Sequence, residues 1–166
     1  MPFGRENNQP AIASSASAAQ PEISTDRRIV IVIPSNVDDE FAPLKEILSG
    51  GGRRRVVVVP IDSGNLITPD DFRSAEWLVL GVGRAPGCEL EVLNTAALAL
   101  VENLAFVFLD PEPGHDADYG KADVVVFRSP LQHAQLASRY GRAHTLAYED
   151  IGTSAAQIAK AIDSAG

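Results

Sequence analysis

The chain has 166 residues, of which 45% are hydrophobic and 6% aromatic, and its formal net charge at pH 7 is −8. This length suits one domain, and the negative charge argues against a non-specific binder of nucleic-acid polymers, because a phosphate backbone is bound through clustered Lys and Arg. Cys88 is the only cysteine, which excludes an intrachain disulfide, and no apolar run approaches the ~20 residues that span a membrane. We therefore expect a cytoplasmic protein that makes no membrane contact.

The first part of the chain differs in composition from the rest. Residues 1–26 are rich in Ala, Ser, Gln, Asn and Pro and have no hydrophobic period. Such a segment buries too little apolar surface to offset the entropy lost on ordering. We expect residues 1–26 to be a disordered tail and residues 27–166 to form a single domain.

Five short apolar runs and a weaker sixth follow the tail. The first, Ile29–Ile33, is apolar at every position and is closed by Pro34, which is typical of a strand buried on both faces. The other strands are expected at Val56–Val59, Trp77–Leu80, Ala105–Leu109, Val124–Phe127 and, as the weakest, His144–Tyr148.

Helical patterns separate these runs. The first begins at a cap, Asp38 or Asp39, and ends at Gly50, with apolar residues at Phe41, Leu44, Ile47 and Leu48. Further helices are expected at Pro69–Ser74, Glu89–Glu102 and Leu131–Tyr140, and a closing helix is expected after a cap at Thr153 or Ser154. The alternation predicts an α/β three-layer sandwich of the Rossmann-like or flavodoxin-like type, with a mostly parallel sheet of five or six strands.

In such a sheet, ligands bind outside the carboxyl ends of the strands, where the strand order reverses. Polar residues and glycines follow the first four expected strands, and we expect the substrate to contact them. The candidates are Ser35 and Asp38 after the first strand, Asp62 after the second, Gly83, Arg84 and Gly87 after the third, and Asp110 after the fourth.

The turn after the third strand is the most distinctive of these segments. Glycines lead into a helix whose first turn carries Glu89 and Glu91. The backbone N–H groups of such a turn suit a phosphate or another anion. The two glutamates either complement the helix dipole or act as catalytic carboxylates, and Arg84 either meets an anion or lies solvated on the surface.

The residues Gly87-Cys88-Glu89-Leu90-Glu91, the Ala-rich helix after them and the strand Phe106–Leu109 resemble the nucleoside 2-deoxyribosyltransferase-like family. The segment Ile31–Ser35 resembles the first strand and substrate loop of that family. The resemblance implies cleavage of the N-glycosidic bond of a nucleoside or nucleotide, by hydrolysis or base exchange. It implies no metal and no organic cofactor, and a homodimer or larger homo-oligomer.

The resemblance also implies roles for individual residues. Glu91 takes the position of the glutamate that attacks the anomeric carbon or stabilises its developing positive charge, with Glu89 as the second choice. Asp62 or Asp38 would orient sugar hydroxyls or assist the leaving base. The N–H groups near Gly87 would hold a 5′-phosphate.

The chain also departs from the family pattern. Leu93 and Thr95 stand where the family has Gly and Ala, and Glu102-Asn103-Leu104-Ala105 replaces its G-K-P turn. No acidic residue lies between the third strand and the motif. The missing acidic residue and the altered turn favour an alternative, namely a non-catalytic nucleotide-binding or protein-interaction module of the same fold.

Overall fold

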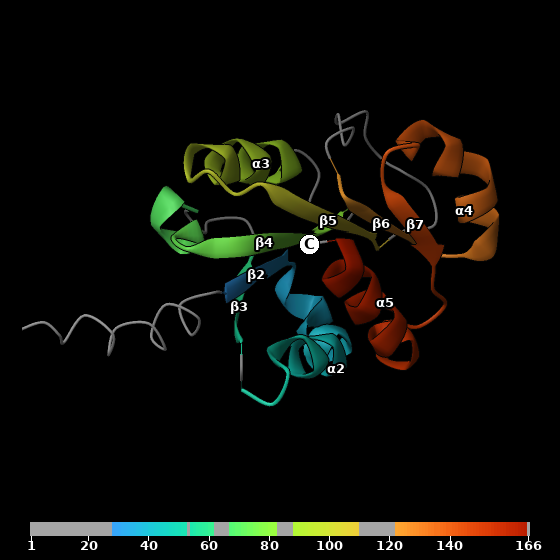
Figure 1. The fold of residues 1–166 in the computed structure, drawn as a ribbon, viewed down its shortest axis with the longest axis horizontal. Helices are drawn as coiled ribbons and strands as arrows, with labels where there is room; N and C mark the ends of the chain where they lie inside the picture. Colours follow the sequence, from blue (N-terminus) through green and yellow to red (C-terminus); the bar gives the residue numbers. More distant parts are fainter. Residues whose placement is uncertain (1–27, 53, 62–66, 83–87, 110–121, 166) are drawn as a thin grey trace, which may run out of the picture.

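The computed structural model describes residues 28–52, 54–61, 67–82, 88–109 and 122–165. Its six strands form one sheet in the order β3-β2-β4-β5-β6-β7, and every neighbouring pair is parallel (Figure 1). The prediction of a parallel α/β sheet is therefore confirmed, whereas the expected tail lies outside the described residues. The strands are β2 Arg28–Ile33, β3 Arg55–Pro60, β4 Ala75–Val82, β5 Asn103–Phe108, β6 Val124–Phe127 and β7 His144–Ala147.

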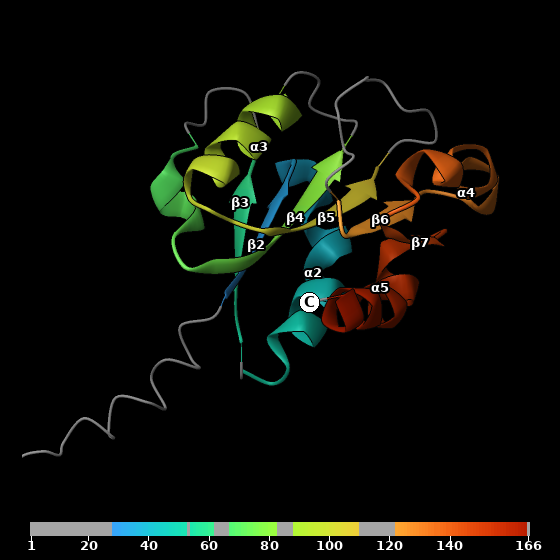
Figure 2. The same ribbon diagram turned by 45° about the horizontal axis from the view of Figure 1, so that its top comes forward.

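Helices cover both faces of the sheet (Figures 1 and 2). On one face α2 and α5 pack against the strands and against each other, and on the other face lie α3, α4 and a short 3-10 turn, η4. The three layers and the strand order, in which the second strand along the chain lies outside the first, make this a flavodoxin-like α/β fold. The helices are α2 Asp38–Ser49, α3 Cys88–Leu98, α4 Pro130–Leu136 and α5 Ile151–Ala165, and the 3-10 turns are η3 Ser35–Val37, η4 Pro69–Phe72 and η5 Ala137–Tyr140.

The central strands are buried on both sides, as their uninterrupted apolar sequences predict. In β2, Ile29, Ile31 and Ile33 pack against the α2 and α5 layer, and Val30 and Val32 pack against the opposite layer. All five side chains are fully buried. This alternation follows from the two-residue period of a strand.

Two helix starts differ from the prediction. Asp38 is the first residue of α2 and not its cap, because η3 precedes the helix directly. Helix α5 begins at Ile151, and the side chain of Asp150 accepts a hydrogen bond of 3.0 Å from the N–H of Thr153. Asp150 therefore satisfies a free N–H of the first turn, the role that had been assigned to residues further along the chain.

Helix α3 ends earlier than expected, at Leu98 instead of Glu102. Leu100 has a φ of 63°, and the N–H of Val101 bonds the carbonyl of Ala96 over 3.1 Å. This is the hydrogen-bond pattern of a Schellman motif, which usually has glycine at the left-handed position. The expected helix Pro69–Ser74 is also shorter and is the 3-10 turn η4.

None of the helices in the described part of the chain is both long and apolar enough to cross a bilayer.

Candidate functional site

The strand order reverses between β2 and β4. From β2 the chain moves outward to β3, and it then returns across the sheet to β4 on the other side of β2. In open parallel sheets, the carboxyl ends of the strands at this point form the ligand-binding crevice. Here the two helices that follow β2 and β4 lie on opposite faces, α2 on one and α3 on the other (Figure 1).

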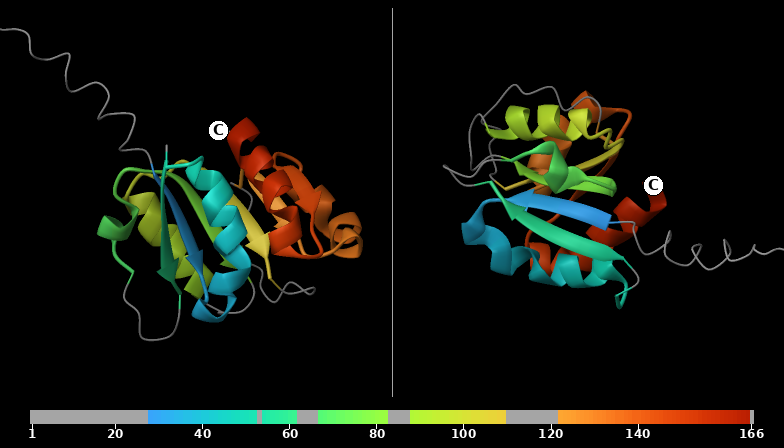
Figure 3. Two further views of the ribbon diagram at one scale, coloured as in Figure 1. Left: turned by 90° about the horizontal axis from the view of Figure 1, so that it is seen from below. Right: turned by 90° about the vertical axis from the view of Figure 1, so that its left-hand side faces the viewer.

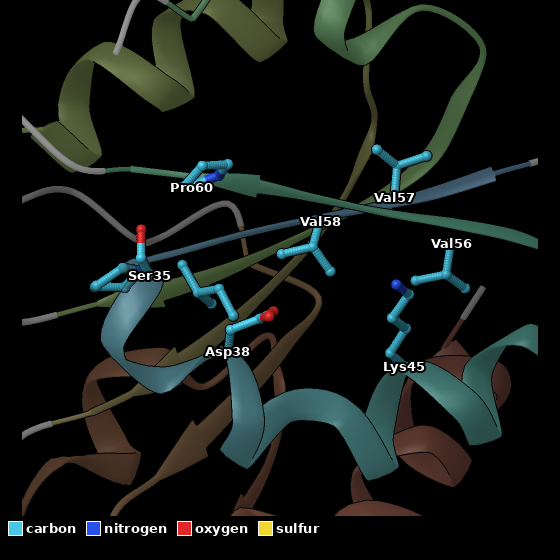
Figure 4. Close-up of a pocket in the computed structure, with 9 residues that line it drawn as sticks. Ser35, Asp38, Lys45, Val56, Val57, Val58 and Pro60 are labelled. Atoms are coloured by element: carbon cyan, nitrogen blue, oxygen red, sulfur yellow. The ribbon is translucent and has the colours of Figure 1, made fainter. Parts of the chain in front are cut away.

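The structure brings together two of the predicted substrate-binding residues, Ser35 and Asp38. They line a cavity of about 430 Å³ together with Lys45 and Pro60 (Figure 4). The rest of the lining consists of Ile33, Pro34, Val56, Val57 and Val58. Because β3 is the edge strand, this cavity lies along the outer border of the sheet.

The two predicted carboxylates both lie in the first turn of α3. Glu89 is 2% exposed, whereas Glu91 is exposed. The difference follows from the helix phase, because Val92 and Ala96, three and seven residues after Glu89, pack against the sheet. Glu89, predicted as the second choice after Glu91, is therefore the carboxylate that points into the protein.

Asp38 and Glu89 do not share one pocket wall. Asp38 belongs to the helix layer of α2 and α5, and Glu89 to the opposite layer, with the sheet between them. The other predicted site residues, Asp62, Gly83, Arg84, Gly87 and Asp110, lie outside the described residues.

The structure adds Arg128, which directly follows β6 and so lies at the carboxyl ends of the strands. Its Nη1 donates a hydrogen bond to the carbonyl of Leu109, and its backbone N–H donates to Oε1 of Gln132 over 2.6 Å. Its guanidinium carbon lies 6.0 Å from the centre of the Tyr148 ring. Two contacts thus hold the half-buried guanidinium at the carboxyl ends of β5 and β6, and the hydrogen bond to Gln132 holds the backbone that carries it.

A guanidinium has five N–H donors in a rigid fork that matches carboxylates and phosphates. Among the described residues, only the carbonyl of Leu109 accepts a side-chain hydrogen bond from Arg128, which leaves the other donors of the guanidinium for an anion. Arg128 could have been found in the sequence, because it comes just after a buried apolar run, as Ser35 does. The candidates predicted from the sequence all follow the first four strands, and Arg128 follows the fifth.

Among the described residues, no three His, Cys, Asp or Glu side chains are grouped so that they could hold a metal ion.

Comparisons with known proteins add likenesses of fold. No family model matches the chain, and no curated protein matches it. The solved structures that it is similar to include the flavodoxin-like domain of a Synechococcus sp. protein, with 15% identity, a TM-score of 0.44, and 83% of this chain and 95% of that chain covered. An archaeal flavodoxin has 11% identity and the same TM-score of 0.44, with 84% and 96% covered.

Proposed function

We propose that the carboxyl edge of this sheet binds a nucleoside 5′-monophosphate and that Glu89 assists cleavage of its N-glycosidic bond. The observation that carries this proposal is the burial of Glu89 in the first turn of α3, beside the point where the strand order reverses. Glutamate is rarely fully buried unless it is paired, because its charged form loses hydration inside a protein. The support for a functional role is therefore the place of this buried carboxylate, in the first turn after a strand whose carboxyl end borders the expected ligand crevice.

The chemistry needs a negative group near the sugar. As the bond between C1′ and the base nitrogen lengthens, its electron pair leaves with the base, and C1′ becomes positively charged. A carboxylate either stabilises this charge or forms a bond to C1′, which water then hydrolyses. Water supplies the oxygen that ends on C1′ and the proton that ends on the base. In a site from which water is excluded, the attraction between carboxylate and sugar is stronger than in solution.

Arg128 is better placed for the phosphate than the start of α3. The first turn of α3 carries two carboxylates, which repel a further anion there. Arg128 presents a fixed cation at the end of β6, and only β5 separates β6 from β4. Two strand spacings of ~4.8 Å give a lateral separation of about 10 Å between the ends of β4 and β6. A ligand that contacts both Glu89 and Arg128 therefore lies across the carboxyl ends of β4, β5 and β6.

The test is release of free base from a panel of nucleoside monophosphates, followed by chromatography. Glu89→Gln keeps the shape and removes the charge, so it should abolish release, whereas Glu91→Gln, on the exposed side of the same turn, should retain it. Circular dichroism of both variants checks that the fold is intact. No release by the unaltered chain, or equal loss in both variants, would contradict the role of Glu89.

A second candidate function is a non-catalytic nucleotide-binding module. It is favoured by the exposure of Glu91, the residue that corresponds to the catalytic glutamate of the resembled family. Calorimetry with the same nucleotides separates the two candidates. Binding without base release supports the module, and binding with release that depends on Glu89 supports the enzyme.

A further inference from the structure

Among the strands that the structure describes, β3 is the first of the sheet, and none pairs with its outer side, the open edge (Figure 3). Its residues Val56–Val59 are half-buried. An edge strand presents unpaired N–H and C=O groups, and proteins usually blunt long apolar edges by charge, proline or a bulge. Here the charge and the proline stand only at the ends of the strand, as Arg55 and Pro60.

The hydrogen bonds of the sheet determine which groups face outward. The N–H of Ile61 bonds the carbonyl of Ile33 over 2.9 Å. In a parallel pair, alternate residues bond to the same neighbour, so Val57 and Val59 bond β2 as Ile61 does. Val56 and Val58 therefore turn their N–H and C=O groups to the open side.

The cavity beside this edge has opposite charges at its two ends. Asp38 lies near Val58, and Lys45 lies near Val56 (Figure 4). They are seven residues apart on α2, which is about 10 Å along the helix axis and on the same helix face. Within the described chain neither side chain has an ion-pair or hydrogen-bond partner, whereas the nearby Arg54 is paired with Asp163 at 2.9 Å.

We propose that a second copy of this chain binds the open edge, with the two β3 strands antiparallel and related by a two-fold axis at Val57. Val56 of one copy then lies opposite the partner's Val58, and each such pair exchanges both of its backbone hydrogen bonds. The interface is self-complementary, as a two-fold dimer requires. The two sheets become one continuous sheet, with both α2 helices on the same face.

Charge complementarity selects this arrangement. Antiparallel pairing about Val57 brings Lys45 of each copy beside the partner's Asp38, whereas parallel pairing would place like charges together. A shift of the axis to Val58 would oppose Val56 to the partner's Pro60, which has no N–H to donate. At the start of β3, the hydrogen bonds between the two copies end before Arg54. The N–H of Arg54 already bonds the carbonyl of Ser49 over 3.0 Å.

The first test is sedimentation of the full chain over a range of concentrations, where we expect a reversible dimer. Val58→Pro removes an outward N–H that the sheet does not use, and proline is tolerated at such edge positions. It should leave the circular dichroism spectrum unchanged and make the chain monomeric. Leu98→Ser removes an exposed leucine from α3, on the opposite face of the sheet from α2, and should leave the dimer intact. A monomer at every concentration, or a dimer lost in Leu98→Ser alone, would overturn the proposal.

The second test exchanges the charges. Lys45→Asp places a carboxylate beside the partner's Asp38 and should raise the dissociation constant at least about tenfold. Adding Asp38→Lys restores opposite charges across the interface and should recover most of the affinity. If the double variant is no tighter than Lys45→Asp alone, these side chains do not face each other, and the register is wrong.

The third test is a cross-link across the axis. In the proposed dimer, Val57 of one copy lies opposite Val57 of the other, in a pair without hydrogen bonds. The Cα atoms of such a pair are ~4.5 Å apart, a distance that a disulfide can span. In a Cys88→Ser background, Val57→Cys should form a covalent dimer under mild oxidation. Val59→Cys, opposite the partner's Arg55, should not. Cross-linking of both variants to the same extent, or of neither, would contradict the pairing.

Discussion

The hydroxyl of Tyr148, the residue after β7, donates a hydrogen bond of 2.5 Å to the backbone carbonyl of Phe108, the last residue of β5. Strand β6 lies between these two strands. The N–H of Tyr148 also bonds the carbonyl of Phe127 at the end of β6, over 2.9 Å. Tyr148 therefore connects the carboxyl ends of three strands, through its buried side chain and its backbone N–H, beside the guanidinium of Arg128.

Tyr148→Phe tests the strength of this connection. The change removes the hydroxyl and keeps the ring, so the carbonyl of Phe108 loses one buried hydrogen bond. We expect the free energy of unfolding to fall by about 1 kcal/mol. Urea denaturation at equilibrium measures it, and an unchanged m-value shows that the folded state has stayed compact. A variant as stable as the unaltered chain would show that the hydrogen bond contributes nothing net.

Gly81→Ala tests the close packing at the end of β4. A Cβ atom at Gly81 would lie 2.9 Å from Cγ2 of Ile33 and 3.1 Å from Cδ1 of Leu109. Both neighbours are fully buried, so relieving the overlap requires shifts in the core. We expect a loss of about 1–3 kcal/mol of stability. Gly141→Ala is the matched control, because nothing lies within 4 Å of its Cβ position, and it should leave the melting temperature unchanged or slightly raised.

Gln132→Ala tests the polar contact that positions the loop after β6. The Gln132 side chain is buried, and its Oε1 accepts the backbone N–H of Arg128. Alanine leaves that N–H without its acceptor, and we expect the unfolding free energy to fall by about 1–3 kcal/mol. Gln135→Ala, on the exposed side of the same helix, should change it little. If thermal denaturation finds equal effects for the two variants, the contact is not what stabilises this loop.

The fold could be predicted from the sequence because its strands are uninterrupted apolar runs separated by clear helix patterns. The end of α3 could not, since Leu100 occupies a left-handed position that usually belongs to glycine and gives no stop signal. Capping by Asp150 was missed for a related reason. Several polar residues precede α5, and only the hydrogen bond to Thr153 distinguishes the true cap.

The choice between the two carboxylates of α3 depended on the phase of the helix. Two residues along a helix are about 200° apart, so Glu89 and Glu91 lie on nearly opposite sides. The apolar residues of α3 surround the helix, because Val92 is buried while Leu90 and Leu98 are exposed. A sequence in which several helix faces are apolar does not reveal which one packs against the sheet. The segment Gly87–Glu91 therefore predicted Glu89 and Glu91 as candidate carboxylates, but not which of them faces the protein interior.

Arg128→Gln tests whether the cation at the end of β6 recognises a phosphate. Glutamine keeps hydrogen-bonding capacity and removes the charge, so binding of a nucleoside monophosphate should weaken at least about tenfold, as expected for loss of a hydrogen bond between charged groups. Binding of the corresponding nucleoside should change little, because it carries no phosphate. Calorimetry with the matched ligand pair at fixed salt concentration measures both affinities.

The design of this last experiment separates recognition from structure. Arg142→Gln removes an exposed arginine from the turn before β7 and should leave both affinities unaltered, which controls for the change in net charge. Arg128→Gln also removes the side-chain bond to Leu109, so its stability is measured alongside. Loss of affinity for the monophosphate alone, in a folded variant, places the phosphate at Arg128. An equal loss for the nucleoside would mean that Arg128 supports the shape of the edge without binding the anion.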